Sequence, residues 1–281
     1  GGVISGKSSI MQLDAWNWED ALIKIDDGIH LNWPSPYLMD YRKRTLRKNK
    51  NYSKSISSIN DFFNESKVSN SKTKLNLPYE AMKGIYYGSE TVYLHANYEK
   101  QIVDGVSFLK SQKIKNIVLV HGEESESLID FLKKHNIPII LSKPHRLPRG
   151  EDLDPNYPYK LAKRLIDNGL LLSIDLSGSM ERTNTRNLPF FAGSFAAYGL
   201  DKEQALKLIT LNAAKILNID KNLGSIEVGK SATLFLSDGD ALDMQTNNIS
   251  LAYINGRKIS LDSHQTKLWK RYSRKYKNQQ D

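Results

Sequence analysis

TVYLHANYEKQIVDGVSFLKSQ (residues 91–112) and NIVLVHGEESESLIDFLKK (residues 116–134) share one layout. Each begins with a short β-prone run that ends in a histidine, His95 in the first and His121 in the second, and continues with apolar residues at helical spacing. Two more strands are predicted at 137–144 and 170–178, separated by a helix. Strands that alternate with helices pair in parallel, because a parallel neighbour is reached only through a crossover. The pattern therefore predicts an α/β fold with a parallel sheet.

The pattern changes at Asp220. Short β-prone pieces follow, with the turn dipeptides Gly-Lys, Asp-Gly and Asn-Gly between them. We therefore expect an α/β body over residues 1–219, a small β module over 220–262 and a basic tail over 263–281. Segments 15–30 and 38–70 are weakly patterned, and the polar stretch that starts at Asn64 predicts an exposed loop.

The formal net charge of +9 lies in two segments. Residues 42–54 hold seven Lys/Arg and no acid, and residues 267–281 hold six Lys/Arg and one Asp, so the rest of the chain carries −3. Such runs usually form solvated surfaces, and nucleic acid is not an expected partner. No apolar run is long enough to predict a membrane span. The compartment stays open between cytoplasm and periplasm, since zero cysteines exclude only disulfides and thiolate ligands.

The histidines that end two strands predict a metal site. In a parallel barrel the active site lies at the carboxyl ends of the strands, where His95 and His121 are expected. Asp175 ends the strand 170–178 and can add an oxygen ligand or act as a base. Two neutral imidazoles can share one divalent metal such as Zn²⁺. The alternative is structural: a single histidine at a strand end is more often a hydrogen-bonded loop residue, and Asp175 can cap the next loop. Spacing alone leaves both interpretations open.

The stretch AYGLDKEQALKLITLNAAKILNIDKNLGSIEVGKSATLFLSDGDAL (residues 197–242), with YINGRKI at 253–259, closely resembles the end of amidohydrolase-superfamily enzymes, especially the group related to imidazolonepropionase. The likeness is strong over about 60 residues and looser over 91–198. Thr233 stands where the family usually has Asp. The matching positions are Gly199, Leu200, Ala205, Leu206, Thr210, Asn212, Ala214, Leu217, Gly224, Ser225, Glu227, Gly229, Lys230 and Ala232.

The resemblance implies a (β/α)8 barrel, of which this chain holds part, and a small β-sandwich built from both chain ends. It also implies a metal-dependent hydrolase that attacks carbon–nitrogen bonds of cyclic amides or amide-like substrates with a metal-activated water. On this mapping His95 and His121 resemble the histidines of strands 5 and 6, and both are metal ligands. Asp175 resembles the strand-8 aspartate, a ligand that also shuttles the proton, while His121 or the metal polarises the carbonyl.

The resemblance also implies ligands that this sequence does not contain. Family members carry a His-x-His pair on strand 1, and no His-x-His occurs here. The opening GGVISGKSSIMQL resembles a family segment after the second strand, so we expect the pair upstream and this chain alone to lack full activity. His30 is present in GIHLNWPSPY (residues 28–37), but no Lys or Glu there can bridge a second metal. A single-metal site is expected.

Substrate contacts are predicted after two strands. His145 and Arg146 follow the strand 137–144, and Arg146 can form bidentate contacts with a substrate carboxylate. Arg186 and Asn187 follow Asp175 and are candidates of the same kind. The alternative for both pairs is a stiff loop without contact to substrate.

Two functions remain at this stage. The first is a zinc-dependent amidohydrolase that takes a small-molecule substrate. The second is a catalytically impaired barrel that acts as a binding or partner subunit, with a homo-oligomer as one arrangement. In the tail, Leu268, Trp269, Tyr272 and Tyr276 lie at near-helical spacing. We expect this stripe to pack on the body or on a partner subunit rather than on a membrane.

Overall fold

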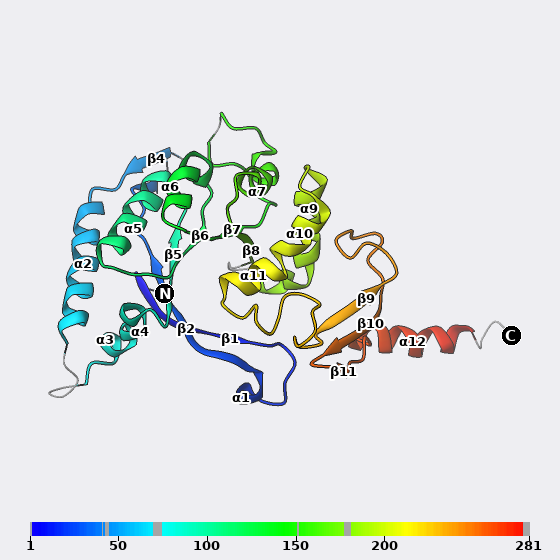
Figure 1. Ribbon diagram of the computed structural model, residues 1–281. Coiled ribbons are helices and arrows are strands. Elements are labelled where there is room, and N and C mark those ends of the chain that lie inside the picture. The colour runs from blue at the N-terminus through cyan, green and yellow to red at the C-terminus, as the bar shows by residue number, and fades with distance from the viewer. Residues whose placement is uncertain are drawn as a thin grey trace.

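A curved six-stranded sheet forms the centre of the computed structural model (Figure 1). The structure describes residues 2–40, 42, 45–69, 75–150, 152–176 and 181–277. The strand order is β1-β2-β5-β6-β7-β8; β1 is antiparallel to β2, and all later neighbours are parallel, which confirms the predicted parallel sheet. The strands are β1 (Ile4–Met11), β2 (Leu22–Asn32), β5 (Thr91–Ala96), β6 (Ile117–His121), β7 (Ile139–Ser142) and β8 (Leu172–Asp175).

The crossover helices cover the outer side of the curved sheet (Figure 1). They are α5 (Glu99–Ser111), α6 (Ile129–Lys134) and α7 (Tyr157–Asp167). The predicted helical spacing of α5 is confirmed, because Ile102, Val106 and Leu109 are fully buried. Asn136 and Gly169 have positive φ angles of 52° and 82°, the left-handed conformation that ends helices. Both predicted helix ends are therefore confirmed.

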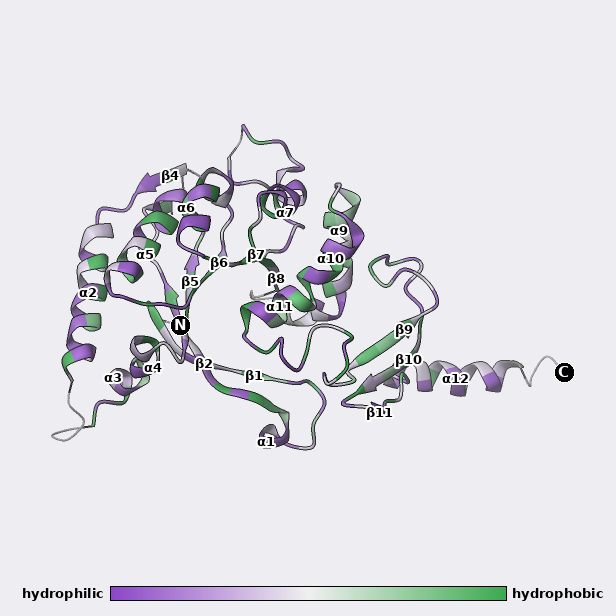
Figure 2. Ribbon diagram, viewed as in Figure 1, coloured by the Kyte–Doolittle hydropathy of each residue, from purple (hydrophilic) through white to green (hydrophobic). Residues whose placement is uncertain are grey.

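The two faces of the sheet differ in chemistry, because side chains alternate along each strand. Leu94 and Leu119 point into the main core beneath the helices. On the opposite, concave face Tyr93, Val118 and Val120 pack against Ile216 of α11 (Leu211–Ile216). In Figure 2 the central strands are among the most hydrophobic parts of the chain. His95, Ser142 and Asp175 alternate onto the same concave face, at the strand ends beyond this small cluster.

The first 90 residues are more regular than predicted. A hairpin of β3 (Tyr37–Asp40) and β4 (Thr45–Lys48) follows β2, and the 17-residue helix α2 (Tyr52–Val68) follows the hairpin. The expected loop at Asn64 is wrong as far as Val68, and residues 70–74 lie outside the described part of the chain. Seven residues of α2 are Ser or Asn, which favour non-helical conformations, so the sequence signal was weak. Burial of Ile59 and Phe63 overrides that preference. The other elements here are α1 (Trp18–Ala21), α3 (Leu77–Ala81) and α4 (Lys83–Tyr87).

A second sheet of three antiparallel strands lies near the C-terminus, in the order β11-β10-β9. The predicted Asn-Gly turn joins β10 to β11, and Asn255 and Gly256 both have positive φ. Asp-Gly at 238–239 instead opens a long loop, so no tight hairpin forms there. The elements of this part are α8 (Glu181–Asn184), α9 (Leu188–Ala197), α10 (Lys202–Leu208), β9 (Leu234–Ser237), β10 (Ile249–Ile254), β11 (Arg257–Lys258) and α12 (His264–Lys277).

Of the two arrangements expected for the tail, packing on the body is wrong, and packing on a partner subunit stays a prediction. Helix α12 extends away from the second sheet (Figure 1). Trp269, Tyr272 and Tyr276 are 70%, 49% and 61% exposed. The periodicity predicted the helix correctly but could not reveal whether its apolar stripe meets the body.

Gly28 should be a sensitive position for stability. A Cβ there would lie 2.3 Å from the carbonyl oxygen of Thr91 and 2.8 Å from the ring of Tyr93. Because backbone of the neighbouring strand must move, Gly28→Ala is expected to lower the free energy of unfolding by about 2 kcal/mol or more. Gly2→Ala, whose Cβ would meet nothing closer than 3.7 Å, is the matched control. Denaturant unfolding measures both, and equal midpoints would contradict the packing described.

Candidate active site at the carboxyl ends of the strands

A row of polar side chains crosses the concave face at the carboxyl ends of the parallel strands. Nδ1 of His30 lies 2.8 Å from Nε2 of His95, and Nδ1 of His95 lies 3.4 Å from Nε2 of His121. Nδ1 of His121 lies 3.1 Å from Oδ2 of Asp175 and 3.4 Å from Oγ of Ser142. The structure thus brings His95, His121 and Asp175 together. With His30 and Ser142, each of the five parallel strands contributes one side chain to these contacts. We call His30, His95, His121 and Asp175 the histidine row.

His121 joins the row only because its backbone departs from the strand conformation. In strict alternation His121 would share the face of Leu119, which points into the main core. Its φ angle is instead +78°, a region that non-glycine residues rarely adopt, and Gly122 continues with +59°. This turn directs the imidazole to the side of His95. An unusual backbone at one residue of a polar cluster is a feature often found at functional sites.

The contacts assign one direction to the hydrogen bonds. An ionised Asp175 accepts from Nδ1–H of His121, which leaves Nε2 of His121 to accept from His95. Nε2 of His95 then accepts from Nδ1–H of His30. Three neutral imidazoles therefore suffice to satisfy the row, with the proton of each pointing toward the carboxylate.

Burial keeps His95 and His30 neutral. It lowers the pKa of His95 to about 4, and the neighbouring His121 and His30 act in the same direction against a smaller opposing effect of Asp175. Burial also lowers the pKa of His30. Neutral imidazole is the form that binds metals and accepts protons, so these rings hold the required state at neutral pH.

Tyr93 supports the row from below. Its ring stacks on His30, with 4.9 Å between centroids and 16° between planes. The Tyr93 hydroxyl donates to Asp27, a carboxylate only 1% exposed that also pairs with Lys24 at 2.6 Å. This buried ion pair fixes Tyr93 and thereby the ring of His30. The sequence analysis did not place His30 in the site. The position of His30, two residues before the end of β2, was the feature that could have indicated it.

The donor types fit a divalent metal, whereas their arrangement is a chain of contacts. His95 and His121 each use one ring nitrogen toward one neighbour and the second toward the other. Within the described ranges, no group of three or more His, Cys, Asp or Glu residues is arranged to hold a metal ion. To bind one metal together, His95 and His121 must each exchange a ring contact for the ion. The ligand roles of His95, His121 and Asp175 therefore stay predictions.

His145 and Arg146 take different positions. Nε2 of His145 lies 2.8 Å from Oγ of Ser194 in α9, and its ring packs edge-on against Phe191. Arg146 instead lies 3.3 Å from Glu123, two residues beyond His121, and is largely buried. Its Nε is a buried nitrogen without a hydrogen-bond partner in the described part of the chain. Arg146 thus contacts the loop that follows His121, while the partner of His145 is a residue of α9 outside the histidine row.

Two residues that sequence reasoning missed hold Arg146 in place. Glu123 pairs with both Arg146 and Arg149, so this cluster carries one unbalanced positive charge. The guanidinium of Arg149 lies 4.9 Å above the ring of Tyr98, which follows the end of β5. Tyr98 in turn meets Tyr37 of the β3–β4 hairpin edge-on at 5.2 Å. A rim of one carboxylate, two guanidinium groups and two tyrosines therefore borders the strand ends.

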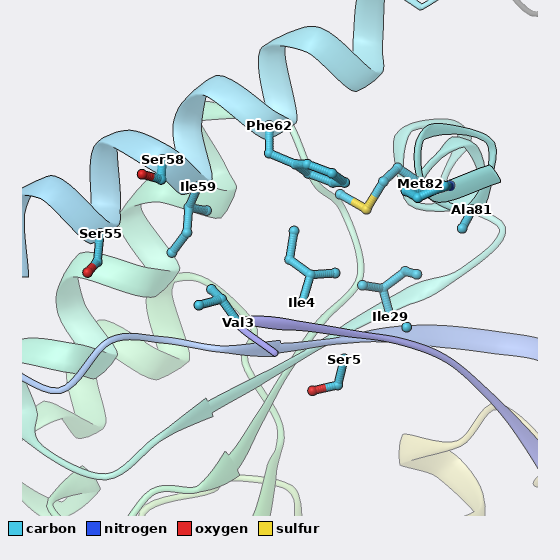
Figure 3. A pocket seen from close by; sticks show the side chains of 12 residues that line it. Val3, Ile4, Ser5, Ile29, Ser55, Ser58, Ile59, Phe62, Ala81 and Met82 are labelled. Carbon is cyan, nitrogen blue, oxygen red and sulfur yellow. The ribbon is translucent and has the colours of Figure 1, made fainter. Parts of the chain in front are cut away.

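Arg186, Asn187 and an apolar cavity near β1 are not part of these contacts. Arg186 is exposed in the short turn Thr185–Asn187, and Asn187 is half-buried. An apolar cavity of about 690 Å³ lies between β1 and the helices α2 and α3 (Figure 3). Side chains such as Ile29, Phe62 and Met82 point into it, and none of its lining residues belongs to the histidine row.

The lowered pKa of His95 predicts a pH-dependent stability. The unfolded chain binds a proton at this ring below about 6.5, whereas the folded chain resists it down to about 4. In chelator-treated protein the free energy of unfolding should therefore fall as pH decreases through this window. His95→Gln should remove up to about 2 kcal/mol of that fall, because the ring is only partly buried. Denaturant titrations at several pH values measure this, with exposed His264→Gln as control; parallel curves for His95→Gln and the parent chain would contradict it.

Sequence comparison relates this chain to known proteins. The chain is 33% identical over 138 residues to the imidazolonepropionase of Caldanaerobacter subterraneus subsp. tengcongensis, which covers 48% of this chain and 32% of that protein. The imidazolonepropionase of Thermoanaerobacter pseudethanolicus is 28% identical over 137 residues, with the same two coverages. The chain thus spans about a third of the length of these curated relatives.

A structural match and a match to a family model support the same relationship. A crystal structure of an amidohydrolase from Thermotoga maritima MSB8 matches 92% of this chain and 69% of its own chain, with a TM-score of 0.74 and 20% identity. At this identity the likeness concerns the fold. The model of the amidohydrolase family matches residues 90–259, which include β5 to β8 with His95, His121 and Asp175. The chain belongs to the amidohydrolase family and is related to imidazolonepropionases.

Proposed function

We propose that the protein to which this chain belongs is a metal-dependent hydrolase of carbon–nitrogen bonds in small amide-like molecules. The observation that carries the proposal is the convergence of His95, His121 and Asp175 on neighbouring strand ends. Family membership and the named imidazolonepropionase relatives support hydrolysis of such bonds. On this proposal the parallel sheet is part of a (β/α)8 barrel over residues 1–219. Residues 220–262 form part of a β-sandwich, followed by the tail 263–281.

His95, His121 and Asp175 would hold the divalent metal, with Zn²⁺ as the expected ion. Neutral imidazole nitrogen and carboxylate oxygen are ordinary zinc ligands. A bound divalent metal supplies Lewis acidity and makes water acidic enough to lose a proton near pH 7. The remaining nitrogen of His95 keeps its contact with His30, a partner that fixes the orientation of a ligating ring.

Asp175 is the proposed proton carrier. Its Oδ2 already accepts a hydrogen bond from Nδ1 of His121 at 3.1 Å, and its side chain is 13% exposed. A carboxylate in this position can accept the proton of the attacking water and return it to the leaving nitrogen. Ser142 and His121 orient the carboxylate side of the row, and the concave apolar cluster beneath excludes water from below.

The rim favours a substrate that carries a carboxylate. Arg146 and Arg149 share the single carboxylate of Glu123, so one positive charge remains for a ligand. A guanidinium binds carboxylate through paired charge-assisted hydrogen bonds. Arg146 is therefore the proposed contact to the substrate, and Arg149 with Tyr98 keeps Glu123 in place.

Removal of either histidine should abolish hydrolysis. In the whole protein, His95→Ala and His121→Ala are expected to lower kcat/KM at least about a hundredfold, because each removes a ligand. His264→Ala, at an exposed histidine in α12, is the matched control and should keep full activity. Metal analysis of the same preparations should show metal in the control and its loss in both variants. Unchanged activity in both histidine variants would contradict the proposal.

Arg146→Ala should affect substrate binding more than chemistry. Glu123 keeps Arg149 as partner, so the fold is retained. We expect KM for a carboxylate-bearing substrate to rise about tenfold or more, the loss of one charge-assisted pair, with little change in kcat. Exposed Arg186→Ala provides the comparison. A larger effect at Arg186 than at Arg146 would assign the carboxylate contact to the loop after β8.

A further inference from the structure

Helix α12 is exposed along its whole described length. Of its described side chains, only Leu268 and Ser273 are even partly covered. It extends beyond the second sheet, and purple, hydrophilic segments recur along it (Figures 1 and 2). A 14-residue helix is marginal alone in water, because nucleation is unfavourable and packing normally supplies its stability. An unpacked helix of this length therefore suggests a surface that it meets.

The residues of α12 divide into two opposite arcs. At about 100° per residue, Leu268, Tyr272, Tyr276 and Trp269 fall within about 100° of the circumference. The cationic residues occupy the opposite side, and none of the 14 residues is acidic. The helix has six cationic residues, Lys267, Lys270, Arg271, Arg274, Lys275 and the terminal Lys277.

Little of this positive charge is balanced. Lys270 pairs with Asp262 at the start of the helix, at 2.7 Å. Lys267, Arg271, Arg274 and Lys275 have no carboxylate partner within the part of the chain that the structure describes. Arg271 and Lys275 lie beside the rings of Tyr272 and Tyr276, each at 5.9 Å from the ring centroid. The helix thus presents an aromatic stripe with Arg271 and Lys275 along one of its edges.

We propose that α12 binds to the surface of a membrane that contains anionic phospholipid. A helix with a strongly cationic face, low net hydrophobicity and Trp and Leu on the other face lies in the plane of the lipid headgroups. Tyrosine and tryptophan rings favour that depth, because they have an apolar body and a polar edge. The long Lys and Arg side chains reach up to the phosphates from a helix that lies on its aromatic side.

Two other partners fit the helix less well. Nucleic acid accounts for the cations but leaves the aromatic stripe on the far side of the helix without a partner. A second α12 would cover the stripe but bring Arg271 and Lys275, at its edge, toward the same cations of the other copy, with no acidic residue in either helix. The remainder of the chain, outside the two basic segments, carries −3, and α12 is the basic segment that also exposes Trp269, Tyr272 and Tyr276.

The experiment is cosedimentation of the full chain with phosphatidylcholine vesicles that do or do not contain phosphatidylglycerol. Binding is expected only with phosphatidylglycerol, and it should weaken as salt rises. Trp269→Ala is expected to weaken binding about tenfold by removing the largest apolar contact. Arg271→Glu with Arg274→Glu should weaken it at least about twentyfold, given roughly fivefold per cation. Circular dichroism verifies that each variant stays folded. Trp269→Ala is not expected to disrupt α12, because alanine favours the helix.

Matched controls come from exposed residues elsewhere. Trp16 is 95% exposed, but Asp14 and Glu19 stand near it, so Trp16→Ala should bind like the parent chain. Lys48→Glu with Lys54→Glu reverses two exposed charges in the other basic segment and should also change little. Equal binding to both vesicle types, or no effect of Trp269→Ala, would overturn the proposal. So would tighter binding to an oligonucleotide that Trp269→Ala leaves unchanged, or self-association through α12 that vesicles do not compete with.

Discussion

The hydrogen-bonded row from His30 through His95 and His121 to Asp175 is the feature on which the proposed chemistry depends. It exists because parallel strands end at one edge of the sheet and because one residue, His121, leaves the strand conformation with φ at +78°. Without that turn the alternation of side chains would point His121 into the main core. The apolar cluster of Tyr93, Val118 and Val120 covers the neighbouring part of the concave face.

Burial gives the row its electrostatic character. The lowered pKa values of His95 and His30 keep their imidazoles neutral. Because Asp175 at the end of the row can only accept, each imidazole donates its Nδ1–H toward that carboxylate. The rim adds positive charge, because among the described residues Arg146 and Arg149 share the one carboxylate of Glu123. Neutral imidazoles at His95 and His30, the carboxylate of Asp175 and the arginines of the rim suit the proposed metal-assisted attack on a substrate whose anionic group the rim holds.

The sequence predicted the parallel units and the strand-end histidines because both follow from local patterns. Apolar runs before His95 and His121 identify buried strands, and Asn136 and Gly169 mark helix ends. It failed where tertiary contacts override local preference, as in the Ser- and Asn-rich helix α2, or where a contact joins distant strands. His30 lies 65 residues from His95, and no local pattern connects them. The exposure of the α12 stripe was unpredictable for the same reason.

The central claim is that His95 and His121 together bind one metal ion on the concave face. Anomalous X-ray diffraction at the zinc edge, from crystals of the whole zinc-loaded protein, tests it most directly. The account predicts one zinc with a ring nitrogen of each histidine at about 2.0–2.1 Å and Asp175 beside it. Zinc bound at another place, while His95 and His121 keep their contacts with each other and with Asp175, would contradict the account.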